Sequence, residues 1–284
     1  MDPHAEGADR QVITRRAIFS LLAARPTRPF AFSFKGYPNW PLEKAFALTP
    51  QLGYTGVELF DPAKMNAAEV RQLSRKHKLP VISIMEDLKL TGDEAAYLVR
   101  LESSLKLARE IGRPIVETVI GAKPEEWAAI RPQFLARLKP WAALGEKNKT
   151  VVAIKAHIGS ALHLPDQAAA LCREINSPFL KLNYDYSHFQ LQHLPLEDTL
   201  KIALPHIAMI HIKDSTGAPP NHRFTLPGQG SIDYTQYAAL LQKLNYNGPI
   251  VVEVSTHVLQ QPNYAPEAAA RFVAKAVLPI FARV

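Results

Sequence analysis

Ionisable side chains gather at or just beyond the ends of apolar, β-rich segments of this chain. These residues are Glu58, Lys155, His157, Asp185, His188, His211 and Glu253. Taken singly, each fits a structural role, since a lone glutamate often pairs with a lysine and a lone histidine often lies in a core. Asp185, His211 and Glu253, however, fall at equivalent depths on consecutive predicted strands. Burying two carboxylates and an imidazole together is costly unless a cation or a hydrogen-bond network compensates, so these three residues predict a functional site.

The elements that must position these side chains alternate regularly along the chain. Strands are expected at 30–34, 56–60, 81–85, 114–119, 151–155, 180–184, 207–212 and 250–254. Helices are expected at 42–52, 67–77, 93–111, 124–144, 165–175, 196–204, 234–244 and 266–281, and Pro132 and Pro140 should break or kink the fourth. Strand–helix units in this order, with no second composition regime, predict an α/β fold, a (β/α)8 TIM barrel over residues 30–284. An open doubly wound sheet is the alternative, but the sequence lacks its Gly-rich turn after the first strand.

In a TIM barrel the active site lies at the carboxyl ends of the strands, which is where the ionisable residues fall. From about Phe30 onward the chain resembles the sugar-phosphate isomerase/epimerase family of xylose isomerase-like TIM barrels. The resemblance is carried by 53–58 (GYTGVE), 183–188 (NYDYSH), 211–214 (HIKD) with 226–234 (LPGQGSIDY), and 248–254 (GPIVVEV). The order and spacing of these segments make the resemblance specific, and it implies the xylose isomerase-like fold.

The resemblance also implies a divalent metal ion, manganese, magnesium or zinc, held by a fifth-strand glutamate together with Asp185, His211 and Glu253. This chain has Lys155 where the family usually has that glutamate. Two outcomes follow. In the first, which we favour because the other ligand positions are intact, the remaining ligands hold an ion more weakly and water or substrate completes its coordination. In the second, the Lys155 ammonium takes the place of the cation and polarises the substrate itself.

By this resemblance the protein is expected to be a sugar isomerase or epimerase that acts on a small keto-sugar or polyol-derived substrate through an enediolate. Glu253 is the expected base, and Lys155 would return the proton provided that its neighbours depress its pKa. The candidate substrate-binding residues are His188, His157, Arg223 and Glu58. A keto-sugar lyase or hydratase on the same scaffold, and a non-catalytic sugar-binding barrel, are the alternatives.

Composition narrows the classes of partner. The formal net charge is +7, but the lysines and arginines are scattered rather than clustered, so no nucleic-acid partner is expected. The single cysteine, Cys172, excludes an intrachain disulfide. No apolar run reaches the roughly 18 residues that a membrane span needs. The expected partner is a small carbohydrate, and the sequence leaves a homo-oligomer open.

Residues 1–29 are expected to form a leader ahead of the predicted barrel, either a degenerate twin-arginine signal or a disordered segment. Arg15 and Arg16 precede a short apolar stretch, and this arrangement resembles a twin-arginine export signal. Arg25 interrupts the apolar stretch, and the region before the arginine pair carries acidic residues. We therefore expect a cytoplasmic protein, with export to the periplasm as the alternative.

Overall fold

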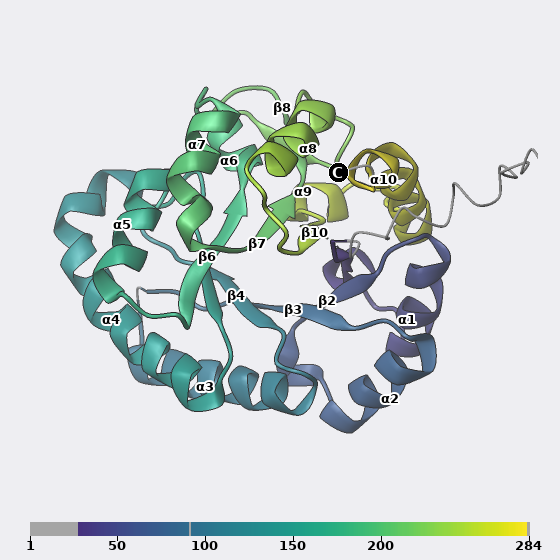
Figure 1. The fold of residues 1–284 in the computed structure, drawn as a ribbon, viewed down its shortest axis with the longest axis horizontal. Coiled ribbons are helices and arrows are strands. Elements are labelled where there is room, and N and C mark those ends of the chain that lie inside the picture. The colour runs from purple at the N-terminus through teal and green to yellow at the C-terminus, as the bar shows by residue number, and fades with distance from the viewer. Residues whose placement is uncertain (1–27, 91, 283–284) are drawn as a thin grey trace, which may run out of the picture.

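The computed structural model describes residues 28–90 and 92–282, so almost all of the expected leader lies outside the described residues. Parallel strands close into a barrel (Figure 1) in the order β1-β10-β7-β6-β5-β4-β3-β2. They are β1 (Phe30–Ser33), β2 (Gly56–Phe60), β3 (Val81–Glu86), β4 (Ile115–Val119), β5 (Val152–Lys155), β6 (Leu180–Asp185), β7 (Ile207–Ile212) and β10 (Ile250–Val252). The predicted (β/α)8 barrel is confirmed.

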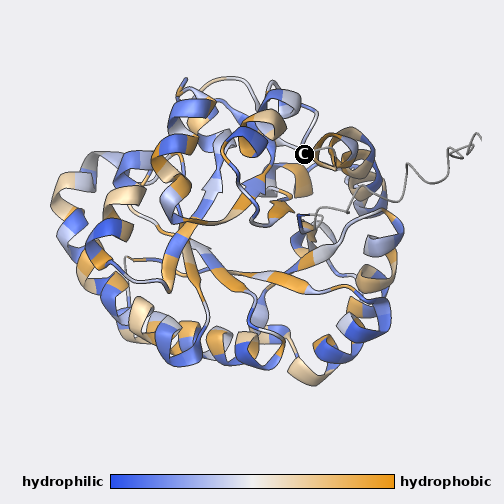
Figure 2. Cartoon of the chain, viewed as in Figure 1, coloured by the Kyte–Doolittle hydropathy of each residue, from blue (hydrophilic) through white to orange (hydrophobic). Residues whose placement is uncertain are grey.

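Helices that follow the barrel strands along the chain form the outer layer of the barrel (Figure 1). They are α1 (Leu42–Gln51), α2 (Ala67–His77), α3 (Glu94–Glu110), α4 (Trp127–Asn148), α5 (Pro165–Ile175), α7 (Leu196–Ala203), α8 (Tyr234–Lys243) and α10 (Pro266–Phe281). Figure 2 shows hydrophobic residues along the barrel strands, whereas the helices carry both hydrophobic and hydrophilic residues. None of the helices in the described part of the chain is both long and apolar enough to cross a membrane.

Helix α4 contains both Pro132 and Pro140 and continues through them to Asn148. The sequence predicted a break or a kink at these residues, and the helix is not broken there. Each proline removes one backbone donor from the helix. The helix keeps its other hydrogen bonds, and it buries Phe134, Leu138 and Trp141.

Short elements that the sequence patterns did not indicate follow several strands at their carboxyl ends. Helix α6 (Tyr186–Gln190) begins directly after β6, and helix α9 (Thr256–Leu259) lies shortly after β10. An antiparallel hairpin of β8 (Asp214–Thr216) and β9 (Arg223–Thr225) follows β7. These elements surround the end of the barrel where the site is expected.

The inside of the barrel is apolar at its amino-terminal end. Ala31, Met209 and Val251 are fully buried and form a small cluster separate from the main core, with Ile82 and Ile115 packed against it. Side chains two positions apart on a strand point to the same face. The residues two positions beyond this apolar floor are Ser33, His211 and Glu253. The period of the strands therefore directs polar side chains inward above the floor.

Candidate active site

A layer of polar side chains lies inside the barrel above the apolar floor. It consists of Ser33, Glu58, Ser83, Glu117, Lys155, Asn183, Asp185, His211 and Glu253, all of them buried. Buried charges are costly unless they are paired and hydrogen-bonded. The pairings within this layer therefore determine what chemistry the site can support.

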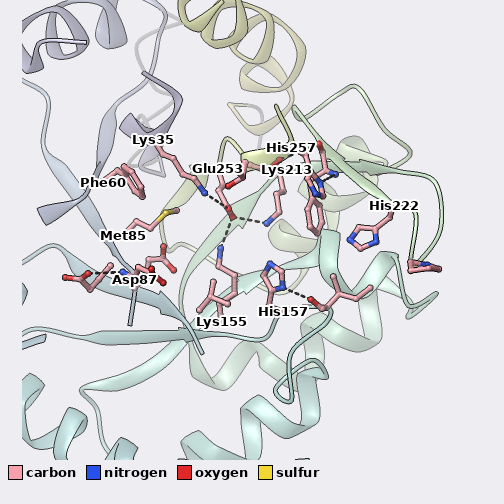
Figure 3. A pocket seen from close by; sticks show the side chains of 18 residues that line it. Lys35, Phe60, Met85, Asp87, Lys155, His157, Lys213, His222, Glu253 and His257 are labelled. Carbon is pink, nitrogen blue, oxygen red and sulfur yellow. Dashed lines mark hydrogen bonds and ion pairs between the residues drawn. The ribbon is translucent and has the colours of Figure 1, made fainter. Parts of the chain in front are cut away.

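The Glu253 carboxylate is the point where three lysines meet (Figure 3). Its Oε2 accepts hydrogen bonds from Lys155 Nζ and Lys213 Nζ, both at 2.8 Å, and its Oε1 lies 4.0 Å from Lys35 Nζ. Burial alone would raise the pKa of Glu253, but the charges of Lys155 and Lys213 outweigh burial and hold that pKa well below its usual range. Glu253 is therefore an ionised carboxylate near neutral pH.

Lys155 ends β5 and reaches the centre of the polar layer. Its Nζ lies 2.8 Å from His211 Nδ1 and 3.8 Å from Asp185 Oδ2, in addition to its bond with Glu253. Burial disfavours the ammonium, but the carboxylates of Glu253, Glu117 and Asp185 outweigh burial and raise the pKa of Lys155. Proton return by Lys155 would require a lowered pKa, and these surroundings raise it instead. They favour a permanent ammonium.

Lys213, one position beyond β7, is a cation of the site that the sequence reasoning did not assign. Its Nζ donates to Asp185 Oδ2, to Glu253 Oε2 at 2.8 Å and to His188 Nε2 at 3.0 Å. An ammonium has three N–H donors, so Lys213 has none left for a ligand. The signal was present in the sequence, because Lys213 is two positions beyond His211 and therefore faces the same way.

His211 is held on both sides of its ring. Its Nε2 lies 2.8 Å from Glu58 Oε2, which also accepts a hydrogen bond from Ser83 Oγ at 2.7 Å. Burial disfavours the charged imidazole, but the Glu58 carboxylate outweighs burial and raises the pKa of His211 to about 9. A neutral His211 accepts a hydrogen bond at Nδ1 from Lys155, and a protonated His211 donates from Nδ1 to Glu253 Oε2 at 3.2 Å. Glu58 thus orients His211 from beneath.

Asp185 joins the site to helix α6. Its Oδ1 accepts hydrogen bonds from Ser187 Oγ at 2.6 Å and from Ser187 N at 3.2 Å, which caps the helix, and its Oδ2 accepts from Lys213. Burial opposes its charge, but the Lys213 ammonium outweighs burial and holds the pKa of Asp185 well below its usual range. The carboxylate is therefore ionised and fixed in position.

The predicted metal ligands do converge. Asp185, His211 and Glu253 each offer a ligand atom within 4.8 Å of the others, and Glu58, Glu117 and His211 do the same, so by residue type and spacing both groups could hold a metal ion. In the first group, however, Lys155 Nζ lies 2.8 Å from both His211 Nδ1 and Glu253 Oε2. Lys213 also donates to both carboxylates of that group. As arranged, the Asp185–His211–Glu253 site does not fit a divalent ion, because an ion there would meet two ammonium groups.

A cavity of about 650 Å³ opens above the polar layer at the carboxyl ends of the strands. Lys35, Lys155 and Lys213 contribute the cations of its lining, and Glu117 and Glu253 lie among them. Phe60 and Met85 supply apolar surface (Figure 3). Phe224 adds to this surface. A cavity of this size, with convergent polar groups on an otherwise mixed wall, is typical of a small-molecule site.

The rings of the predicted residues His157 and His188 lie in contact, tilted by 43° to each other. The ring centroids of His157 and His188 are 3.9 Å apart. Burial lowers the pKa of His157 to about 4 and holds the pKa of His188 well below its usual range, so both are neutral. His157 Nδ1 donates to the Ile158 carbonyl oxygen at 2.6 Å, which leaves Nε2 as an acceptor. His157 lines the pocket, whereas the fully buried His188 holds Lys213.

Arg223 lies apart from the cavity that contains Lys155. It is exposed on β9 and lines a neighbouring hollow of about 520 Å³ together with His222 and His257, which line both spaces. Alternation along β9 explains this position, since Phe224 faces His157 and His188 and its neighbour must face the other way. Arg223 can thus meet only a substrate that extends beyond the main cavity.

The sequence reasoning also missed Lys35 and Glu117. Lys35 lies in a single 3-10 turn (Phe34–Gly36) just after β1. Glu117 lies in the middle of β4, where Asn183 Nδ2 donates to its Oε2 at 2.9 Å and burial raises its pKa. A glutamate within an apolar strand was a usable signal for Glu117, whereas nothing in the sequence gives the direction of the Lys35 side chain.

Comparison with known proteins places these observations in context. A family model described as xylose isomerase-like TIM barrel matches residues 46–276. Fructoselysine 3-epimerase of Escherichia coli O157:H7 is 23% identical over 275 residues, covering 86% of this chain and 96% of that protein. The structure of IOLI protein with a binding zinc atom covers 90% of this chain and 98% of its own, with a TM-score of 0.74 and 18% identity. A xylose isomerase-like TIM barrel protein from Mycobacterium smegmatis in complex with magnesium has a TM-score of 0.67 at 18% identity, covering 90% of this chain and 97% of its own.

Proposed function

Because the chain belongs to the xylose isomerase-like TIM barrel family, we propose that it is a sugar isomerase or epimerase in which the Lys155 ammonium takes the place of a metal ion. The observation that carries this proposal is the position of Lys155 Nζ, 2.8 Å from both His211 Nδ1 and Glu253 Oε2 and 3.8 Å from Asp185 Oδ2. The similarity to fructoselysine 3-epimerase supports the substrate class, a small keto-sugar.

The reaction removes a proton from the carbon next to a carbonyl group and produces an enediolate. The negative charge that develops on the carbonyl oxygen needs a cation or a strong hydrogen-bond donor. Lys155 suits this task because its raised pKa keeps it charged. Its N–H donors bind Glu253 and, when His211 is neutral, His211 Nδ1, so at least one donor is available for the substrate oxygen.

Glu253 is the proposed proton acceptor. Its Oε2 accepts hydrogen bonds from Lys155 and Lys213. Its Oε1 has only Lys35 Nζ as a neighbouring cation among the described residues, at 4.0 Å, so Oε1 is the oxygen that can take the proton. Its low pKa makes Glu253 a weak base. The adjacent ammonium compensates, because polarising the carbonyl group makes the substrate proton more acidic.

The remaining predicted residues position Lys155, Glu253 and the substrate. His157 Nε2 would accept a hydrogen bond from a substrate hydroxyl, and His188 holds Lys213 in place. Glu58 orients His211, and Arg223 would contact only a substrate that reaches the neighbouring hollow. A manganese, magnesium or zinc ion would bind Asp185, His211 and Glu253 only if the Lys155 ammonium moved away.

The proposal is tested by proton exchange in deuterated buffer containing a metal chelator. Purified protein is incubated with a panel of ketopentoses, ketohexoses and their phosphates, and deuterium at carbon is measured by NMR or mass spectrometry. We expect exchange on at least one sugar, and a 100- to 1,000-fold lower rate for Lys155→Met, the magnitude typical of a lost oxyanion donor, about 2.7–4 kcal/mol. Lys64→Met is the matched control, because Lys64 is exposed and pairs only with Asp61 among its described neighbours. No exchange on any sugar would indicate a binding protein instead.

A further inference from the structure

Lys35 is the one ammonium of the site that the proposed reaction leaves without a task. Its side chain is 16% exposed, against 1% for Lys155 and 2% for Lys213. It lines the cavity and points toward Glu253 (Figure 3). We infer that Lys35 is a second catalytic cation, and that Lys35 and Lys155 together bind the two adjacent oxygens of the enediolate. This inference rests on the proposed function.

The supply of hydrogen-bond donors distinguishes the three lysines. Lys213 uses all three of its N–H groups on Asp185, Glu253 and His188. Lys155 uses at most two, on Glu253 and on neutral His211, and keeps at least one. Among the described residues, Lys35 Nζ lies 4.0 Å from Glu253 Oε1 and 5.9 Å from the centre of the Phe60 ring, and neither contact is a hydrogen bond. Its N–H donors are therefore available to a ligand. Lys35 and Lys155 are thus the two ammonium groups with donors to offer.

The charge balance of the site points the same way. Lys35, Lys155 and Lys213 are three cations that face two ionised carboxylates, Asp185 and Glu253. Glu58 is paired with His211, and burial raises the pKa of Glu117. When Glu253 takes the substrate proton, its negative charge passes to the enediolate and the total charge of the site stays the same. Lys35 and Lys155, which face the Glu253 carboxylate before the proton transfer, can then stabilise the enediolate oxygens.

The backbone that carries Lys35 is held rigidly. Tyr264 Oη donates to the Gly36 carbonyl oxygen at 2.5 Å. A Cβ atom on Gly36 would lie 2.7 Å from Val254 Cγ2 and 2.8 Å from the Phe32 ring, so only glycine allows this close approach of the turn to the barrel. Lys35 can therefore move from Glu253 to a substrate oxygen by side-chain rotation alone, from a fixed origin.

Oxalate is a suitable probe, because it is a planar anion with adjacent oxygens, as an enediolate is. Its binding to the protein is measured by calorimetry in the presence of a metal chelator. We expect Lys35→Met and Lys155→Met each to weaken binding about 10- to 100-fold, as expected for a lost hydrogen bond between charged groups. Lys35→Arg should retain most of the affinity, and Lys64→Met should bind as the parent does. Circular dichroism confirms that each variant is folded.

Kinetics provide the second readout. With an exchanging sugar, Lys35→Met should lower kcat much more than it raises KM, because the contact forms only as the enediolate develops. Unchanged oxalate affinity in Lys35→Met, no binding by the parent, or binding that the chelator abolishes would each overturn the inference. If oxalate binding depends on Lys35 but no sugar exchanges, the proposed function fails while the paired cation site stands.

Discussion

Replacing Lys155 by glutamate should convert a site that excludes divalent metal ions into one that binds them. The substitution removes the ammonium that now lies 2.8 Å from His211 Nδ1 and Glu253 Oε2. It adds a carboxylate beside Asp185, His211 and Glu253, which completes a four-ligand oxygen and nitrogen set that suits manganese or zinc. Lys155→Met, which removes the charge without adding a ligand, is the matched comparison.

The magnitude follows from the contacts that each variant loses. Breaking a buried pair typically costs about 3–5 kcal/mol because it leaves a charge uncompensated. Here Glu253 keeps its bond to Lys213, and His211 Nδ1 is 3.2 Å from the same carboxylate oxygen and can donate to it. We therefore expect Lys155→Met to lose about 3 kcal/mol of unfolding free energy, the lower end of that range. Lys155→Glu should lose more in the absence of metal, because three carboxylates then share the charge of Lys213.

The assay is urea unfolding of the parent and both variants, with and without manganese chloride. A metal ion that binds only the folded state stabilises it by about 2.7 kcal/mol at a concentration 100 times its Kd. Lys155→Glu should show this gain, whereas the parent and Lys155→Met should show none. Elemental analysis of the dialysed proteins should find metal only in Lys155→Glu. A parent protein that gains as much stability from manganese as Lys155→Glu would refute the reasoning.

Further predictions concern buried acids, imidazoles and the mouth of the pocket. Burial raises the pKa of Glu117 in the folded state, so the folded protein is most stable where Glu117 is protonated and loses stability as the pH rises and Glu117 ionises. Glu117→Gln should therefore have a higher unfolding free energy than the parent at pH 8 but not at pH 5. His211 has a pKa of about 9 in the folded protein and about 6.5 in the unfolded chain, so its protonated form stabilises the fold by up to about 3 kcal/mol. This stabilisation is complete below about pH 6.5 and is lost as the pH rises to about 9. His211→Gln should flatten that slope, and an equal slope in both proteins would contradict the assignment. Arg223→Ala should raise KM for long or phosphorylated sugars but leave KM for a simple ketopentose unchanged, since Arg223 lies outside the main cavity.

The fold could be predicted because the residue composition of the strands and of the helices is characteristic of each. The expected ranges of β2, α2, α5, β7 and α10 coincide with those in the structure. The hairpin β8–β9 and helix α9 escaped prediction because each is only a few residues long and has no periodic pattern. Helix α4 shows the opposite error, since packing of its buried face overrides the local cost of Pro132 and Pro140.

The site was predictable in its positions but not in its pairings. The spacing of Asp185, His211 and Glu253 places them on neighbouring strand ends, and the structure brings them together. Which cation satisfies them depends on side-chain directions that the sequence does not contain. Lys213 contacts the carboxylates of both Asp185 and Glu253. Lys35 follows β1 and Glu253 follows β10, and the pairing of these two strands closes the barrel and brings the two side chains together. These contacts join segments far apart along the chain, and only the closed fold reveals them.

The apolar floor of Ala31, Met209 and Val251 has a consequence for the traffic of small molecules. Because these side chains are fully buried at the amino-terminal end of the barrel, the floor beneath the lysines is apolar among the described residues. Polar molecules are therefore expected to enter and leave by the mouth at the carboxyl ends of the strands. An anion such as sulfate that binds Lys35 would occupy the place of a substrate oxygen at this mouth, so inhibition by such ions should be competitive with substrate.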